Sequence, residues 1–160
     1  MIVVADTGPI NYLIWIGQIA VLSKLYTTVL IPEAVRDELR KPGAPEFVRR
    51  WIEAPPEWLE IRKPIRAPDV ELMRVRIGPG ERDAILLAEE SGADVLVVDD
   101  QRGRKEAERR KLHTVGTLGV LQFASRKGLL DLREALDRLR STSFYISEEL
   151  IDRLIAETKL

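Results

Sequence analysis

Short β-branched runs alternate with segments of helical periodicity along most of this chain. Ile2–Ala5 reads as a buried strand leading through a turn into a helix, and residues 27–32 read as a second strand before another helix. The strongest strand pattern, over 93–100, follows an amphipathic segment that stops at Gly92. This β-α-β-α-β-α order predicts an α/β fold with a central, mostly parallel sheet and helices on both faces.

The remaining segments complete this picture. Apolar residues at helical spacing over 10–26, interrupted at Gly17, predict two short helices. Beyond residue 129, two amphipathic segments with Asp131 and Ser147 as caps predict a helical hairpin. We expect one domain over 1–160, with 129–160 as a C-terminal helical extension. The same patterns predict further helices over 44–54, 102–112 and 117–128, and short strands over 59–61 and 113–115.

The amino-acid composition excludes several kinds of functional site and partner. The 25 basic and 26 acidic side chains give a net charge of -1, so no global field draws nucleic acid or a membrane. The absence of cysteine excludes disulfides, thiolate zinc sites and cysteine nucleophiles, and agrees with a cytoplasmic protein. No signal peptide or membrane-spanning run is apparent. We therefore expect a soluble protein with no membrane partner.

Four carboxylates stand where a parallel sheet would bring them together. Asp6 and Asp99 follow predicted strands, whereas Glu38 and Glu81 lie in predicted helices. The carboxyl ends of parallel strands share one edge of a sheet, and ionised carboxylates against an apolar core are costly without a partner. Converging carboxylates also repel one another. A hard divalent cation such as Mg²⁺ or Mn²⁺ would remove both problems.

Three motifs resemble those of the PIN-domain family, the nuclease fold of VapC-type toxin ribonucleases. "VVADTGPINYL" resembles its opening strand with an acidic and a small hydroxyl residue, and "VLIPEAVRDEL" its second strand and glutamate-bearing helix. "GERDAILLAEESGADVLVVDD" resembles its acidic helix and a strand ending in aspartate; the family register counted from Glu81 falls on Asp99. "GTLGVL" and "DDQRGR" look more like an uncharacterised PIN branch with GE…DD motifs. The resemblance covers about residues 1–125 and implies a three-layer α/β/α fold.

The resemblance implies a metal-dependent endoribonuclease that hydrolyses RNA phosphodiester bonds with one or two Mg²⁺ or Mn²⁺ ions. Asp100 could be a further ligand or the N-cap of the next helix, and Asp83 a supporting or a solvated residue. Thr7 could hydrogen-bond a ligand carboxylate or be an ordinary turn hydroxyl. A toxin of a VapBC-type system would have a small antitoxin partner and form a homodimer. The implied catalytic residues and metal ligands are Asp6, Glu38, Glu81 and Asp99.

The same residues also have to be weighed against other roles and other classes of protein. Arg102 and Arg104 follow the acidic pair and could bind an RNA backbone, although a charged helix face is also typical of a solvated surface. A receiver domain needs an acidic pair after its first strand, and a haloacid dehalogenase-type phosphatase needs two aspartates separated by one residue. Only Asp6 follows the first strand here. The remaining alternative is a catalytically inactive PIN-fold interaction module.

Overall fold

The computed structural model describes residues 1–159 and is built on a five-stranded sheet in the order β3-β2-β1-β4-β5. The central strand β1 (Ile2–Ala5) lies between β2 (Thr28–Pro32) and β4 (Val95–Val97). The edge strands are β3 (Leu59–Arg62) and β5 (Thr114–Val115). Every pairing is parallel, which confirms the predicted α/β class.

Two apolar cores lie on opposite faces of this sheet, and β1 contributes to both. Val3 and Ala5 belong to the larger core, and Val4 belongs to the smaller one. All three side chains are buried, as expected for successive residues of a strand that point to alternate faces. A continuous apolar run is the sequence signature of a strand covered on both sides.

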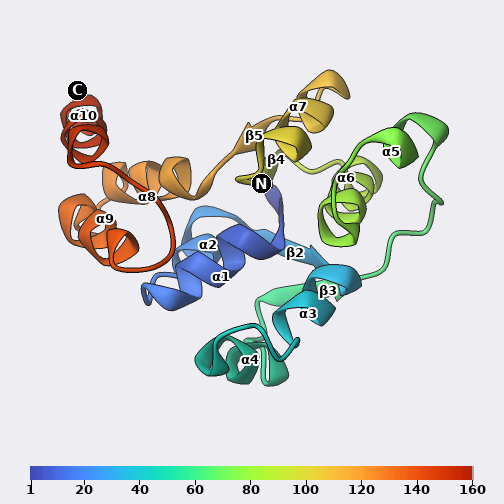
Figure 1. Ribbon diagram of the computed structural model, residues 1–160, viewed down its shortest axis with the longest axis horizontal. Coiled ribbons are helices and arrows are strands. Elements are labelled where there is room, and N and C mark those ends of the chain that lie inside the picture. The colour runs from blue at the N-terminus through green and yellow to red at the C-terminus, as the bar shows by residue number, and fades with distance from the viewer. Residues whose placement is uncertain (160) are drawn as a thin grey trace.

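Helices cover both faces of the sheet (Figure 1). On the side of the smaller core lie α5 (Val70–Arg74), α6 (Pro79–Ser91) and α7 (Gln101–Arg109). The helices that contribute to the larger core are α1 (Thr7–Trp15), α2 (Val21–Leu25), α3 (Glu33–Leu39), α4 (Glu46–Glu53), α8 (Thr117–Arg126), α9 (Leu132–Arg140) and α10 (Glu148–Thr158).

The ends of several helices follow the sequence signals. Gly17 and Gly92 adopt positive φ values where α1 and α6 have ended, a backbone region that glycine enters at little cost. The Asp131 carboxylate accepts a hydrogen bond from the Glu134 N–H, and the Ser147 hydroxyl caps α10. The helix α5 was not predicted, because five residues in a proline-flanked segment are too few to show a period.

The C-terminal hairpin packs on the sheet-covering helices. α9 and α10 contact each other, and both contact α8. Figure 1 shows this three-helix group on the side of the molecule opposite α5 and α6. Within residues 1–159, no helix combines the length and apolarity that a membrane crossing requires.

Candidate metal centre

The fold brings the four predicted carboxylates to the carboxyl ends of the central strands. Asp6 directly follows β1, and Asp99 lies two residues beyond β4, the strand paired with β1. The Asp6 N–H donates to the carbonyl of Val97 at 3.0 Å, so the segments that follow β1 and β4 leave the sheet side by side. Glu38 and Glu81 arrive from α3 and α6, whose contact is marked by a 3.0 Å hydrogen bond from Gly80 N–H to Glu38 Oε1. We call these four residues the acidic cluster.

Asp6 is the most unusual member of the acidic cluster. Its side chain is only 6% exposed, and within residues 1–159 its buried Oδ1 accepts no hydrogen bond. Burial raises the pKa of Asp6 to about 7; the backbone N–H of Thr7 opposes this rise, and the charges of Glu81, Glu38 and Asp99 add to it. Within the protein, the Thr7 N–H therefore compensates only part of the negative charge that Asp6 carries when ionised.

Glu81 presents a second oxygen of the same kind. It lies in the first turn of α6, and its buried Oε2 has no hydrogen-bond partner in the described part of the chain. Burial raises its pKa, and the neighbouring charges of Asp100 and Glu38 act in the same direction. Two buried carboxylate oxygens, one from the end of β1 and one from α6, are thus left without donors.

Glu38 and Asp99 are held by donors instead. Glu38 accepts a hydrogen bond from the Thr7 hydroxyl as well as from Gly80 N–H. Asp99 accepts from Thr117 twice, through the backbone N–H at 2.7 Å and the hydroxyl at 2.6 Å. Such contacts fix the orientation of a carboxylate. Thr117 is fully buried, and sequence reasoning assigned it no role, although a threonine opening a helix after a strand repeats the arrangement of Thr7.

Glycines allow the backbone to approach three of the carboxylates. A Cβ on Gly103 would lie 2.5 Å from Glu81 Oε2, and one on Gly80 would lie 2.8 Å from both Glu38 oxygens. A Cβ on Gly116 would lie 2.8 Å from Asp99 Oδ1. None of these distances is compatible with an unshifted side chain. The absence of a side chain at these positions therefore sets where the carboxylates lie.

Gly103→Ala tests that dependence. The fold should tolerate the change, because alanine is favoured over glycine inside a helix by roughly 1 kcal/mol and the Glu81 side chain can swing away. Affinity for a divalent cation should fall by about 10- to 100-fold, the usual effect of disturbing the support of a metal ligand. Gly43→Ala is the control, since a Cβ there meets nothing within 4 Å. Equal metal affinity of both variants, measured alongside thermal melting, would contradict the assigned role of Gly103.

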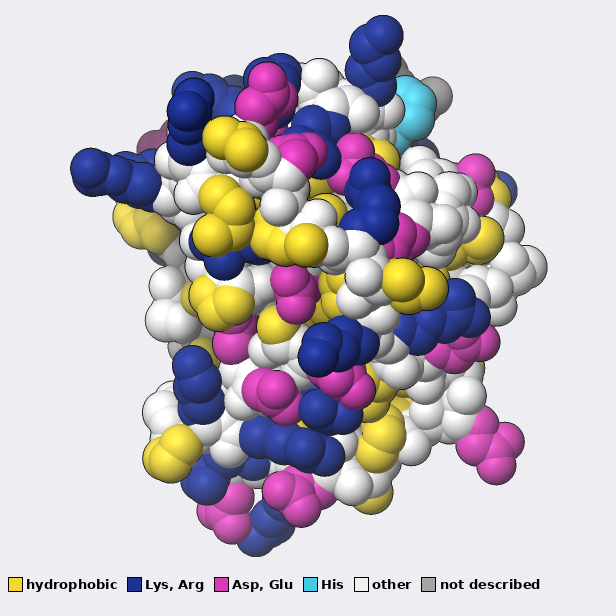
Figure 2. All heavy atoms as spheres, turned by 90° about the vertical axis from the view of Figure 1, so that its right-hand side faces the viewer, with side chains coloured by type: hydrophobic (Ala, Val, Ile, Leu, Met, Phe, Trp, Pro, Cys, Tyr) yellow, Lys and Arg dark blue, Asp and Glu magenta, His cyan; other side chains and the backbone are white. Residues whose placement is uncertain are grey.

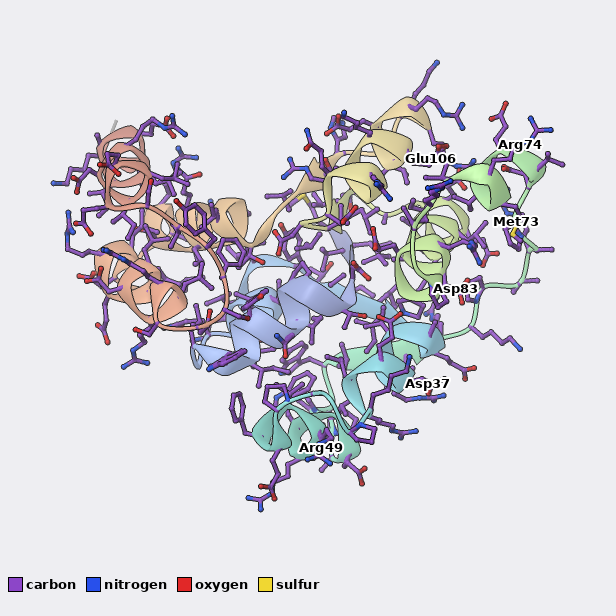
Figure 3. All side chains as sticks on the ribbon, in the orientation of Figure 1. Asp37, Arg49, Met73, Arg74, Asp83 and Glu106 are labelled. Carbon is purple, nitrogen blue, oxygen red and sulfur yellow. The ribbon has the colours of Figure 1, made fainter. Side chains whose placement is uncertain are left out.

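Asp100 and Asp83 lie at the margin of the acidic cluster. Asp100 is the N-cap of α7, its Oδ1 accepting from the N–H groups of Arg102 at 2.9 Å and Gly103 at 3.3 Å. Burial raises the pKa of Asp83, the nearby charges of Arg82 and Lys63 lower it, and the charge of Glu38 adds to the rise. Figure 3 shows Asp83 on α6, at the side of the molecule that carries the segment leading to α5. Asp83 is also not among the charges that raise the pKa of Asp6.

The donor set fits a hard divalent cation. As the side chains lie, no three acidic or histidine groups within residues 1–159 surround a point that could hold a metal ion. Two members of the acidic cluster are turned towards threonine hydroxyls, and two offer unpartnered buried oxygens. Carboxylate oxygen is the ligand that Mg²⁺ and Mn²⁺ prefer, and a cation would compensate the charges that now raise the pKa of Asp6.

The four arginines of α7 and its C-cap divide into two groups. Arg110 forms ion pairs with Asp69 at 2.6 Å and Glu89 at 2.9 Å, and Arg109 bonds to the buried Glu106. The two ion pairs of Arg110 hold the end of α7 against α5 and α6, whereas the pair of Arg109 with Glu106 lies within α7. Figure 3 shows Glu106 on the side of α7 that faces α5. Figure 2 shows acidic and basic side chains interspersed over this face of the molecule. Sequence proximity to the acidic cluster therefore does not make Arg109 and Arg110 available to a polyanion.

Arg102 and Arg104 form the second group. Within residues 1–159, neither guanidinium makes an ion pair at 4.0 Å or less. Arg102 is exposed, and Arg104 is half-buried beside Gly116, where its Nη1 would lie 3.1 Å from an added Cβ. Both positive charges thus remain available near Asp99.

Comparison with known protein families identifies the family to which this chain belongs. A family model described as PIN domain matches residues 2–159, and the chain belongs to the PIN-domain family. PIN domains are generally nucleases that use divalent metal ions, in agreement with the chemistry of the acidic cluster. The match continues past residue 125, where the motif resemblance ended, and includes α9 and α10. No curated protein shows significant similarity to the chain.

Proposed function

We propose that this protein is a metal-dependent endoribonuclease that hydrolyses RNA phosphodiester bonds at the acidic cluster. The observation that carries the proposal is the Asp6 carboxylate, which is buried, has an oxygen without a donor and is surrounded by three further acidic side chains. A protein retains such an energetically costly group where its function needs it. In a PIN-domain chain, binding a divalent cation is that function.

Each residue of the site would have a separate role. One or two bound Mg²⁺ or Mn²⁺ ions would supply Lewis-acid chemistry, polarising the phosphate and lowering the pKa of water. Asp6 and Glu81 would ligate through their unpartnered oxygens. Thr7 and Thr117 hold the carboxylates of Glu38 and Asp99 in fixed orientations. Asp100 would act on Glu81 through its charge while it caps α7.

The unpaired cations support a polyanionic substrate. Arg102 and Arg104 lie on α7 directly after Asp99 and Asp100, so they could bind phosphates on either side of the cleaved bond. Such contacts carry no base preference and weaken as salt is added. RNA, rather than DNA, is proposed on the likeness of the three motifs to VapC-type ribonucleases.

Cleavage of end-labelled single strands tests the proposal. With Mg²⁺ or Mn²⁺, the purified protein should produce internal cuts in RNA, and a chelator should stop the reaction. Single-stranded DNA of the same sequence, labelled at the same end, controls for the choice of RNA. A folded protein that cuts neither strand with either ion would support the alternative, an inactive PIN-fold interaction module.

A toxin role is a finer proposal on the same motifs. It would place the protein in the cytoplasm, as a homodimer held inactive by a small antitoxin protein. Expression in bacteria of the wild-type chain should then arrest growth, and Asp6→Asn should not. Growth that is unaffected by active, soluble enzyme would exclude the toxin role and leave the nuclease proposal standing.

A further inference from the structure

A cavity of about 370 Å³ opens beside the acidic cluster. Asp99 lines it, so the cavity and the cluster share a carboxylate. Its other walls include Arg104 from α7, Gly116 and Leu118 from the start of α8, and Phe144 from the loop between α9 and α10. This volume falls within the range of about 300–1,000 Å³ in which proteins hold small organic groups.

Phe144 reaches this cavity from the C-terminal extension. The loop that carries it runs past α8 to α1 (Figure 1). There the Tyr12 ring meets the Phe144 ring edge-on, with centroids 5.0 Å apart, and the Tyr12 and Ser143 hydroxyls lie 3.0 Å apart. The Phe144 N–H also donates to the Thr142 hydroxyl at 3.1 Å. These contacts fix an aromatic ring at a wall of the cavity.

Besides the Asp99 carboxylate, the cavity combines an aromatic, an aliphatic and a basic surface. Phe144 and Leu118 are aromatic and aliphatic, and both are only partly buried. Arg104 supplies a positive charge that no acidic side chain within residues 1–159 neutralises through an ion pair. An aromatic platform next to a cation is the pairing with which proteins bind single-stranded nucleic acid, since every base has a π-face and every nucleotide a phosphate.

We infer that this cavity is a nucleobase subsite, which binds one base of single-stranded RNA next to the phosphate that is cleaved. Phe144 stacks on the base, Leu118 contacts it, and Arg104 binds the adjacent phosphate. The inference rests on the proposed nuclease function and gives the C-terminal extension a part in it. The extension positions the substrate through Phe144 in addition to packing against α8.

RNA that lacks one base tests the subsite. The cleaved bond is first mapped in a short RNA, and the base on each side of it is then removed in turn while the backbone is kept. Phe144→Ala should lower kcat/KM on intact RNA by about tenfold, the loss of one base–aromatic stack. On the RNA that lacks the stacked base, Phe144→Ala and wild type should be equal. Tyr145→Ala is the matched control, since Tyr145 is 90% exposed and outside this cavity.

Two further measurements keep the outcomes distinct. Phe144→Leu retains an apolar contact with Tyr12 but no aromatic face, so it should match Phe144→Ala in kcat/KM and wild type in thermal melting. Normal cleavage by Phe144→Ala, or an equal loss on intact and base-free RNA, overturns the subsite and leaves the nuclease intact. A wild-type protein that neither cleaves nor binds RNA overturns both.

Discussion

Asp6→Asn is expected to reduce RNA cleavage by about 10³-fold or more while making the metal-free protein more stable. The loss of activity follows because a bound cation contributes several kcal/mol to transition-state stabilisation, and each 1.36 kcal/mol corresponds to a factor of ten. The gain in stability follows because asparagine has the shape of aspartate without the buried charge. Opposite effects on activity and stability distinguish a functional residue from a structural one.

The stability difference has a defined pH dependence. The pKa of Asp6 rises from 3.8 to about 7 on folding, so between these values the folded state holds a proton that the unfolded state has released. The contribution of protonated Asp6 to the free energy of unfolding is thus fully present below pH 3.8, and it is lost as pH rises through about 7. The resulting loss of folding stability approaches roughly 4 kcal/mol at about pH 8, whereas near pH 4 it is below about 1 kcal/mol.

Urea unfolding with a chelator present measures this difference. The free energies of unfolding of wild type and Asp6→Asn should diverge as pH rises from about 4 to about 8. Asp37→Asn is a suitable control, because Asp37 is exposed on α3 next to Glu38 (Figure 3). Parallel stability curves for Asp6→Asn and wild type would show that the Asp6 carboxylate is not penalised by burial.

Mn²⁺ or Mg²⁺ is expected to raise the melting temperature of the wild-type protein by about 5–10 °C. An ion at about 100 times its dissociation constant adds roughly 2.7 kcal/mol to the stability of the folded state. For a chain of this length, each kcal/mol shifts the melting temperature by about 2–4 °C. The gain should be larger at about pH 8 than at about pH 6, because the ion must displace a proton from Asp6 below its pKa of about 7.

Variants of the acidic cluster locate the ion. Asp6→Asn and Glu81→Gln should abolish the metal-dependent rise in melting temperature, since they alter the two carboxylates that have unpartnered oxygens. Asp83→Asn should retain most of the rise, because Asp83 is not among the charges that raise the pKa of Asp6 or Glu81. An unchanged rise in Asp6→Asn would place the ion elsewhere on the protein.

The sequence by itself determined the fold class and the acidic residues at the strand ends. Burial on both faces leaves a continuous apolar run, which identified β1 and β4. Local capping signals at Asp131 and Ser147 marked the starts of α9 and α10. A parallel sheet brings the ends of adjacent strands to one edge, so the sequence is enough to group Asp6 with Asp99.

Only the tertiary structure decided how these groups are bonded. It left Asp6 and Glu81 with unpartnered oxygens but supplied Asp99 with both donors of Thr117. In the folded protein, Arg110 forms ion pairs with carboxylates that are distant in sequence, and Phe144 lines the same cavity as Asp99. Periodicity and caps depend on residues a few positions apart, whereas these bonds join side chains from separate elements and depend on how the helices pack over the sheet.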